Sequence, residues 1–500
     1  MKARRKWSIG LAGAALVSSL ALAAWAFYSA NGVGAGDGSV GMLASPVVTA
    51  TTSASGVADV SWTSVPNPAG DGAPVTYTVD RSADAGTSWS PANFTCAGVL
   101  SGTSCQDHPA MTGSYLYRVT ARYRSWTSIG VSNSVLVQVA TKLSFMTASQ
   151  TLTAGVSSGT ITVQRQDASS TPVTIGSILV TLSSDSPTGI FRDLADSTTI
   201  TSVTIANGSS TASFKYRDTT AGSPTITASS SGLSSATQQE TVNPAAAASL
   251  TLAAATTTPT AGAADNLTIT AKDTYGNTAT SYTGDKTLTF GGASTIGTNN
   301  PTVSDKNGVA RNFGVSTTIT FTNGVATVSG SNNGVMKLYK AETALITVSD
   351  STINNNPGLS VTVSPAARVG IVLSNITAAP SPALTCTGSV GSLSCSSVNE
   401  SNAAATLTAK ISLADQYQNI VTNTTGSSIT IDLATSGDGN VTPTGANALT
   451  ITNGSSTTST PGTGTFTLTR NNGNNKLVTM TATVHGTSQT LTVVLSSFDS

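Results

Sequence analysis

The chain has 500 residues, of which only 9% are charged and 5% are aromatic, and its formal net charge is zero. An average soluble domain has about 25% charged residues. A chain of this length exceeds what one hydrophobic core usually serves, so we expect about three to five domains. Without an excess of basic residues to neutralise phosphates, nucleic acid is not expected as a partner.

The polar residues are mainly Ser, Thr, Asn and Gly, which favour strands and turns. Helix-forming glutamate is nearly absent, since Glu240, Glu342 and Glu400 are the only ones. Val and Ile recur at every second position in many segments, a pattern typical of half-buried strands rather than of disorder. The sequence therefore predicts an all-β fold of tandem β-sandwich domains, immunoglobulin-like or similar to fibronectin type III, after an N-terminal signal segment.

Residues 1–30 combine a basic start with an apolar segment from Trp7 to Tyr28, as in a signal peptide. Ala24 and Ala26 flank Trp25 in a small-x-small cleavage site. The alternative is a signal anchor that stays in the membrane, since about 20 apolar residues can span a bilayer. Both alternatives predict a secreted or cell-surface protein that meets a membrane only through an uncleaved leader.

The two ends of the chain give further expectations. The segment from Phe27 to Leu43 resembles the leader junction of camelysin-like matrix fibre proteins of Gram-positive bacteria, and this resemblance implies a matrix or surface fibre as an alternative function. Residues 495–500 contain neither a sorting signal nor an apolar tail, so covalent attachment to a cell wall by that route is not expected.

Residues 45–140 carry aromatic residues on alternating strand patterns. Trp62 ends the run Val60-Ser61-Trp62, and alternating residues follow in the segments 75–79 and 115–121. Tyr115, Tyr117, Val119 and Ala121 would share one face of a strand and fill a sandwich core. These features resemble a fibronectin type III domain, which implies a β-sandwich.

A strand-and-turn pattern occurs three times in the rest of the chain. Each copy has an alternating apolar segment that leads to an Asp, and an Asn-Gly pair follows well downstream. The residues of the pattern are Asp167 with Asn207 and Gly208; Asp273, Gly276 and Asn277 with Asn323 and Gly324; and Asp415 and Asn419 with Asn453 and Gly454. We expect hairpin turns at the Asn-Gly pairs, because such pairs accept positive φ angles.

The spacing of the copies is that of whole domains, which predicts repeats at 142–245, 247–366 and 367–500. The junctions Asn243-Pro244-Ala245 and Ser364-Pro365-Ala366 resemble each other and suit short linkers. The run Asp273-Thr274-Tyr275-Gly276-Asn277 resembles the Asp-x-x-Gly-Asn turn of bacterial immunoglobulin-like domains of the invasin and intimin type. The copy at Asp415 lacks the Gly, and the copy at Asp167 keeps only the Asp and a later Pro.

Four cysteines lie in two pairs with identical spacing, Cys96 with Cys105 and Cys386 with Cys395. In an exported protein, close pairs in an even number favour disulfides. Each disulfide would close a short loop and contribute on the order of 2–3 kcal/mol. A zinc site is the alternative, although zinc usually takes four ligands with tighter spacing.

No pattern indicates catalysis, a metal site or a cofactor. The two histidines, His108 and His485, fall in different predicted domains, and neither is near a nucleophile motif. The acid pairs Asp193 with Asp196 and Asp432 with Asp438 lie among turn residues. We therefore expect a non-enzymatic structural or adhesive protein. Its partner would be an extracellular protein, a glycan or another copy of the chain.

Two other functions stay open at this point. Low charge leaves edge strands with little protection against pairing, so a self-assembling matrix or surface fibre is the alternative. An accessory module for polysaccharide binding would need a row of exposed aromatic residues, and aromatic residues are few. An isopeptide bond is a further option at Lys215 or Lys272, which lie near aromatic residues.

Overall fold

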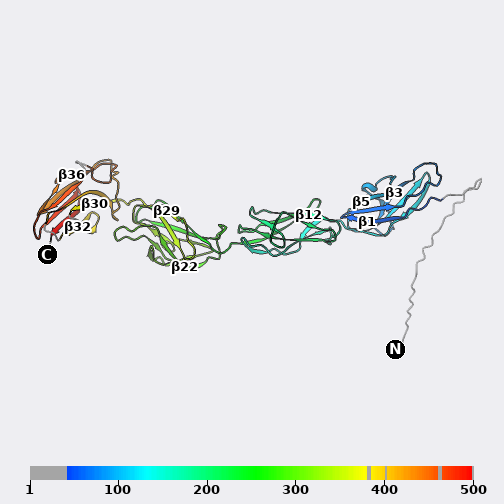
Figure 1. Cartoon of the computed structure of the whole chain (residues 1–500), viewed down its shortest axis with the longest axis horizontal. Helices are drawn as coiled ribbons and strands as arrows, with labels where there is room; N and C mark the ends of the chain where they lie inside the picture. The colour runs from blue at the N-terminus through cyan, green and yellow to red at the C-terminus, as the bar shows by residue number, and fades with distance from the viewer. Residues whose placement is uncertain (1–41, 380–383, 400–402, 460–463, 498–500) are drawn as a thin grey trace, which may run out of the picture. The chain divides into compact units, whose positions relative to one another are not determined.

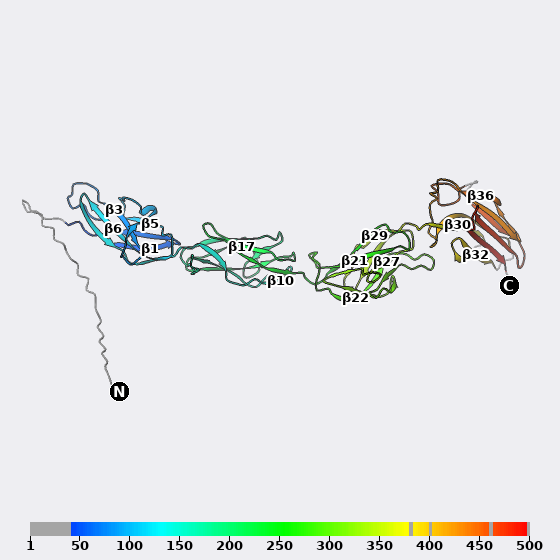
Figure 2. The ribbon, with the colours of Figure 1, turned by 180° about the vertical axis from the view of Figure 1, so that it is seen from behind.

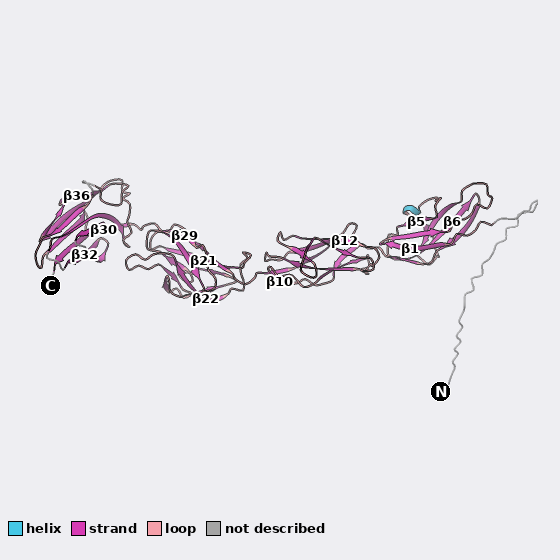
Figure 3. Cartoon of the chain, viewed as in Figure 1, coloured by secondary structure: helices cyan, strands magenta, loops and turns pink. Residues whose placement is uncertain are grey.

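A computed structural model describes residues 42–379, 384–399, 403–459 and 464–497. The predicted leader, with Ala24 and Ala26, lies outside the described residues. Among the described residues, no helix has the length and apolar character needed to cross a membrane. Strands account for nearly all regular structure, and the helical element of this part of the chain is the 3₁₀ turn η1 (Phe94–Cys96) (Figure 3).

The described residues divide into two compact units. One contains the residues up to Ala50 together with Asp59–Asp107 and Tyr115–Ser134. The other contains Thr51–Ala58, His108–Ser114 and everything from Val135 onward. All strands from β9 onward therefore belong to the second unit.

The strands up to β8 form two sheets (Figure 1). One has the order β1-β2-β5, and the other has the order β4-β3-β6-β7 with β8 added beside β6. The strand bounds are β1 Val48–Ala54, β2 Val57–Trp62, β3 Thr76–Ser82, β4 Ser90–Pro91, β5 Ser104–Asp107, β6 Gly113–Tyr123, β7 Trp126–Val131 and β8 Val135–Val137. Alternate residues of β6 are buried, as the sequence pattern predicts, and the Trp62 and Tyr77 rings lie 5.4 Å apart in this core.

The predicted segments 142–245, 247–366 and 367–500 are called the first, second and third repeat. The first repeat contains a five-stranded sheet, β14-β13-β16-β11-β9, and a four-stranded sheet, β15-β12-β17-β18. A short parallel pair joins β10 to β19. The bounds are β9 Lys142–Phe145, β10 Thr151–Thr153, β11 Ile161–Gln166, β12 Ile178–Ser184, β13 Ile190–Arg192, β14 Thr199–Ile200, β15 Ser202–Ile205, β16 Thr211–Arg217, β17 Thr225–Ser229, β18 Ala236–Gln239 and β19 Thr241–Asn243.

The second repeat has a similar plan, with the sheet β20-β21-β27-β23-β24, in which β26 also pairs with β21, and the sheet β25-β22-β28-β29. Figure 2 shows β21, β22, β27 and β29 from behind. The bounds are β20 Ser249–Ala254, β21 Ala264–Lys272, β22 Gly284–Gly291, β23 Thr302–Ser304, β24 Ala310–Asn312, β25 Thr317–Phe321, β26 Val325–Thr327, β27 Val335–Lys337, β28 Thr343–Ser349 and β29 Leu359–Thr362.

The third repeat has the sheets β30-β33-β37-β35 and β31-β32-β39-β38-β34-β36. Strands β32 and β39 are parallel neighbours, and the other pairs are antiparallel. The bounds are β30 Arg368–Ala379, β31 Thr385–Ser389, β32 Ser392–Asn399, β33 Ala405–Asp415, β34 Ile429–Gly437, β35 Gly439–Thr442, β36 Gly445–Ile451, β37 Phe466–Arg470, β38 Leu477–Val484 and β39 Thr490–Ser497.

Each repeat has its own cluster of buried apolar side chains between its two sheets. In the first repeat, for example, Val180 and Ile226 of the four-stranded sheet are buried in one cluster with Ile161 and Phe214 of the five-stranded sheet. The rings of Phe214 and Phe191, on neighbouring strands of the five-stranded sheet, lie 5.5 Å apart. Sandwich cores of this kind arise from strands with one apolar face. The chain is therefore an all-β protein of tandem β-sandwiches, as the sequence predicts.

Candidate functional site

The three repeated Asp residues have the same local geometry. Asp273 follows β21, and one oxygen of its carboxylate, Oδ1, accepts from the backbone amides of Tyr275 and Asn277, both at 2.9 Å. The backbone closes the same turn, since Asp273 N donates to Asn277 O at 2.9 Å. A carboxylate that replaces backbone acceptors in this way stabilises a tight turn at the end of a strand.

The copies at Asp415 and Asp167 form the same turn. Asp415 Oδ1 accepts from the amides of Tyr417 and Asn419, both at 2.9 Å. Asp167 Oδ1 accepts from the amides two and four residues further on, at 2.9 and 2.8 Å. All three Asp side chains are buried. Burial works to raise the pKa of Asp273, but the hydrogen bonds from Asn277 and the backbone amides outweigh it and hold the pKa below its usual value.

A fourth turn of this geometry was not predicted from the sequence. Asp305 Oδ1 accepts from the amides of Asn307 and Val309 at 2.9 and 3.0 Å, and Asp305 N donates to Val309 O. The other carboxylate oxygen pairs with Arg311 at 3.0 Å. The signal that could have revealed this turn is the Gly three residues after the Asp, at position 308, where φ is +83°.

The prediction of hairpin turns is confirmed locally at Asn323-Gly324, where Thr322 and Val325 form an antiparallel bridge, and was wrong at Asn207-Gly208 and Asn453-Gly454. Each pair links a strand of one sheet to a strand of the other sheet of its repeat: β15 to β16, β25 to β26 and β36 to β37. Only Asn323 and Gly324 both have positive φ, and there Thr322 and Val325 exchange backbone hydrogen bonds. At the other two pairs, only the Gly has positive φ. The tight turn was readable from the sequence, whereas the sheet that the next strand joins was not.

Both predicted disulfides are present. Cys96 of η1 is bonded to Cys105 of β5, and both residues are buried. Cys386 and Cys395 are directly opposite each other in the antiparallel pair β31 and β32. Cys395 is buried and Cys386 is exposed. Each disulfide therefore closes a short local loop and does not join separate domains.

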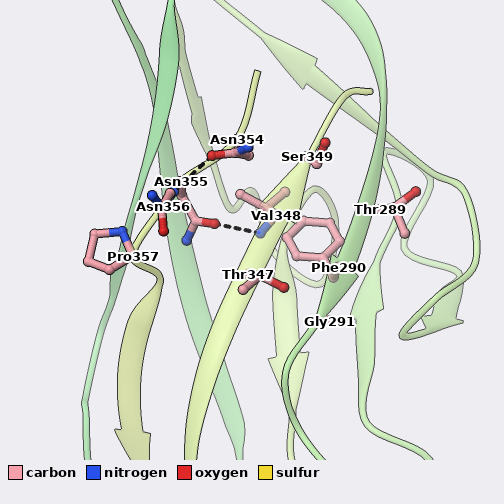
Figure 4. A pocket seen from close by; sticks show the side chains of 10 residues that line it. All are labelled: Thr289, Phe290, Gly291, Thr347, Val348, Ser349, Asn354, Asn355, Asn356 and Pro357. Carbon is pink, nitrogen blue, oxygen red and sulfur yellow. Dashed lines mark hydrogen bonds between the residues drawn. The ribbon is translucent and has the colours of Figure 1, made fainter. Parts of the chain in front are cut away.

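A pocket of 460 Å³ lies in the second repeat, beside the end of β22, the end of β28 and the loop 354–357. Its ten lining residues are neutral, and the side chain of Asn355 turns to the neighbouring strand (Figure 4). Asn355 accepts from Val348 N at 2.7 Å and donates to Ile346 O at 3.0 Å. This amide therefore serves the backbone of the sandwich, and the lining offers no acid or base for chemistry.

The titratable residues that the sequence analysis considered for catalysis lie at or near the surface. His485 Nδ1 lies 2.8 Å from Asp432 Oδ2, with the His side chain 54% exposed. Asp438 pairs with Lys476, and Asp196 pairs with Arg192, which ends β13 four residues earlier. Within residues 42–379, 384–399, 403–459 and 464–497, no group of three or more His, Cys, Asp and Glu side chains is placed to hold a metal ion.

Comparison with known proteins gives likenesses only among solved structures. No protein-family model matches the chain, and no curated protein matches it. FdeC, an adhesin of Escherichia coli, is 17% identical over 71% of this chain and 96% of its own, with a TM-score of 0.27. Domains 4–9 of the surface layer protein SbsC are 12% identical over 91% of this chain and 66% of that chain, with a TM-score of 0.23.

A third likeness is to the FN1–FN3 domains of chicken CNTN1, which are 11% identical over 65% of this chain and 100% of that chain, with a TM-score of 0.19. Likeness at these TM-scores carries no argument about fold or function. The sheets and cores described above show by themselves that the chain is a tandem array of β-sandwiches, the two-sheet architecture of immunoglobulin-like and fibronectin type III-like domains.

Proposed function

We propose that the protein is exported and acts outside the cytoplasm as a non-enzymatic structural or adhesive protein. The observation that carries this proposal is the tandem array of sandwiches with all four cysteines in disulfides. Disulfides of this kind persist in oxidising compartments and are rare in the cytosol. The leader that the sequence predicts at residues 1–30 supports export, and the neutral pocket lining and scattered surface acids support a non-enzymatic role.

The segments 45–140, 142–245, 247–366 and 367–500 would act as separate domains that carry binding surfaces. Loops at the ends of sandwiches and exposed strand edges are the usual sites of recognition in such folds. The partner would be an extracellular protein or a glycan. The turn at Asp273 and the leader junction support an origin in a Gram-positive surface protein with invasin-type and intimin-type repeats.

The test is the intact mass of the protein made by its own host, with and without reduction and alkylation. Loss of about 26–30 residues, together with four protected thiols, would support a released extracellular protein. A complete N-terminus with protected thiols would support a surface protein anchored by its leader. Free thiols, or a hydrolase activity abolished by one Asp substitution, would contradict the proposal.

A self-assembling fibre is the second candidate, and one observation favours it. Strand β31 lies at the edge of the six-stranded sheet of the third repeat, and all five of its residues are exposed. None of them is charged, so the edge lacks the charges that usually prevent pairing with another chain. Light scattering after size-exclusion chromatography separates the candidates: oligomers that disappear in a Thr387→Lys variant favour the fibre, and a monomer at high concentration contradicts it.

A further inference from the structure

Asn277 binds the backbone of the preceding repeat. Its side-chain nitrogen donates to Thr219 O at 2.8 Å, and its side-chain oxygen accepts from Ala221 N at 2.9 Å. Thr219 and Ala221 lie in the loop between β16 and β17 of the first repeat, whereas Asn277 follows β21 of the second. The planar amide therefore pairs with two backbone groups two residues apart, as a neighbouring strand would.

The same arrangement occurs one repeat further along. The Asn419 side chain donates to Tyr339 O at 2.7 Å and accepts from Ala341 N at 2.6 Å. Tyr339 and Ala341 lie in the loop between β27 and β28 of the second repeat, the counterpart of the loop that Asn277 binds. Two independent stretches of sequence thus produce one contact geometry.

The Asp of each turn ties the linker into the same contact. Asp273 Oδ2 accepts from Ala245 N at 2.9 Å and from the Asn277 side chain at 2.8 Å. Asp415 Oδ2 accepts from Ala366 N and from the Asn419 side chain, both at 2.8 Å. Since Oδ1 already holds the turn, the second oxygen is left for the linker that enters the repeat.

A tyrosine and a glycine complete each junction. A Cβ on Gly155 would stand 1.9 Å from the hydroxyl of Tyr275, and one on Gly262 would stand 2.0 Å from that of Tyr417. Each Gly belongs to the preceding repeat and has a positive φ, +79° and +77°. The rings therefore contact the preceding repeat at positions where only Gly leaves room.

One other turn in the chain separates the local role from the junction role. The turn at Asp305, inside the second repeat, has Asn307 and Val309 where the junction turns have Tyr and Asn, and it closes with the same Asp hydrogen bonds. The turn itself therefore needs only the Asp, and the Tyr and Asn are additional. The turn at Asp167 also lacks the Tyr and Asn, but it lies beside residues 110–112 of the preceding segment and does not serve as this comparison.

We propose that the Asp-x-Tyr-x-Asn turns at 273–277 and 415–419 are interdomain latches, each of which fixes a repeat to the repeat before it. The partner of each latch is a backbone loop and a glycine of the preceding repeat. This proposal does not depend on what the protein binds. An intracellular or enzymatic protein with these turns would have the same fixed junctions.

The first experiment measures the junction between the first and second repeats in the full chain. Nitroxide labels on non-canonical residues replace Leu179 and Leu345, which are exposed on β12 and β28, so that the four cysteines stay paired. Pulsed electron paramagnetic resonance then gives the distribution of distances between the labels. We expect Asn277→Ala to widen this distribution by about twofold or more, because the two repeats lose their fixed contact.

The matched control is Asn207→Ala, in the first repeat. The Asn207 side chain accepts from Gly176 N at 2.8 Å, so this variant loses one side-chain hydrogen bond that stays within a single repeat. We expect the distribution of label distances in Asn207→Ala to be as wide as that in the unmodified chain. An unchanged width in Asn277→Ala, or an equal widening in Asn207→Ala, would overturn the proposal.

The second experiment tests the junction between the second and third repeats. It keeps the proposal testable even if Asn277→Ala folds poorly. Labels at Leu345 and Leu477, both exposed, report on Asn419→Ala. In the same variant, hydrogen exchange at the amide of Ala341 should accelerate about fivefold or more, because its acceptor is gone. The amide of Tyr417, held by Asp415, should stay protected. Unchanged width and unchanged exchange at Ala341 would contradict the latch.

Discussion

The hydroxyl of Tyr417 lies 2.0 Å from the point where a Cβ on Gly262 would stand, so these two residues fit together only because Gly262 has no side chain. Gly262 also has a φ of +77°, which side chains tolerate poorly. We predict that Gly262→Ala destabilises the second repeat by about 2–4 kcal/mol, from backbone strain and from the clash together. Urea midpoints from pulsed hydrogen exchange report each repeat separately and would measure this loss.

The chain contains a matched control for that substitution. Gly426 has a φ of +78°, and a Cβ on it would meet no atom within 4 Å. Gly426→Ala should therefore cost only the backbone part, about 1–2 kcal/mol. In a Tyr417→Ala background, the cost of Gly262→Ala should fall to that of Gly426→Ala. Equal costs for the two Gly substitutions in the unmodified chain would show that the tyrosine contact is not tight.

The third position after the Asp gives a second prediction, at Gln418. Gln418 has a φ of +76°, whereas the same position of the second repeat is Gly276, with a φ of +87°. We expect Gln418→Gly to stabilise the third repeat by about 0.5–1 kcal/mol, because the relief of strain exceeds the added freedom of the unfolded chain. The reverse change, Gly276→Gln, should destabilise the second repeat. A loss of stability in Gln418→Gly would refute this account of the turn.

The fold could be predicted from the sequence because the patterns that indicate it lie within short stretches of the chain. Alternating apolar residues predicted strands such as β21 and β33, and a strand that buries one face needs a second sheet to cover it. The two disulfides followed from spacing and expected compartment. The domain boundaries at 45–140, 142–245, 247–366 and 367–500 stay predictions.

The junction contacts could not be predicted in the same way. Asn277 binds the carbonyl of Thr219 and the amide of Ala221, and backbone groups have no sequence signature. The recurrence of Asp, Tyr and Asn at 273–277 and 415–419, with a Gly in each preceding repeat, was the available signal. This pattern by itself indicates an ordinary turn, because the sequence does not identify the loop that the Tyr and Asn contact. The hairpin prediction failed at Asn207-Gly208 and Asn453-Gly454 for a related reason, since a tight turn does not specify which sheet the next strand joins.

The two disulfides should differ in their resistance to reduction. Cys96 and Cys105 are both buried, at 0% and 8% exposure, whereas Cys386 lies on the exposed edge strand β31. A thiolate must reach a sulfur atom to reduce the bond. We predict that dithiothreitol under native conditions reduces the bond between Cys386 and Cys395 first. Alkylation at timed intervals, followed by peptide mass spectrometry, would give the order, and earlier alkylation of Cys96 would contradict it.

The last prediction concerns acid stability and the pair Tyr282 and Asp350 in the second repeat. The Tyr282 hydroxyl donates to Asp350 Oδ2 at 2.7 Å, and the amides of Thr352 and Ile353 donate to Oδ1, both at 2.9 Å. Burial works to raise the pKa of Asp350, but these hydrogen bonds outweigh it and lower the pKa from 3.8 to about 2. Burial also raises the pKa of Tyr282, which keeps the hydroxyl a donor.

Because the pKa of Asp350 is lower in the folded state than in the unfolded state, the carboxylate stabilises the fold above about pH 4. This contribution is lost as the pH falls towards 2 and Asp350 takes up a proton. In Tyr282→Phe, which keeps the ring against Phe321, we expect the pKa of Asp350 to rise towards 3.8 and the loss of stability to begin at higher pH. Carbon-13 titration of the Asp carboxyls would measure the pKa of Asp350 in the unmodified chain and in Tyr282→Phe. The control is Asp84, whose pKa of about 2 depends on Ser82 and Ser88 and should not change. An Asp350 that titrates at the same pH in both variants would show that Tyr282 does not set its pKa.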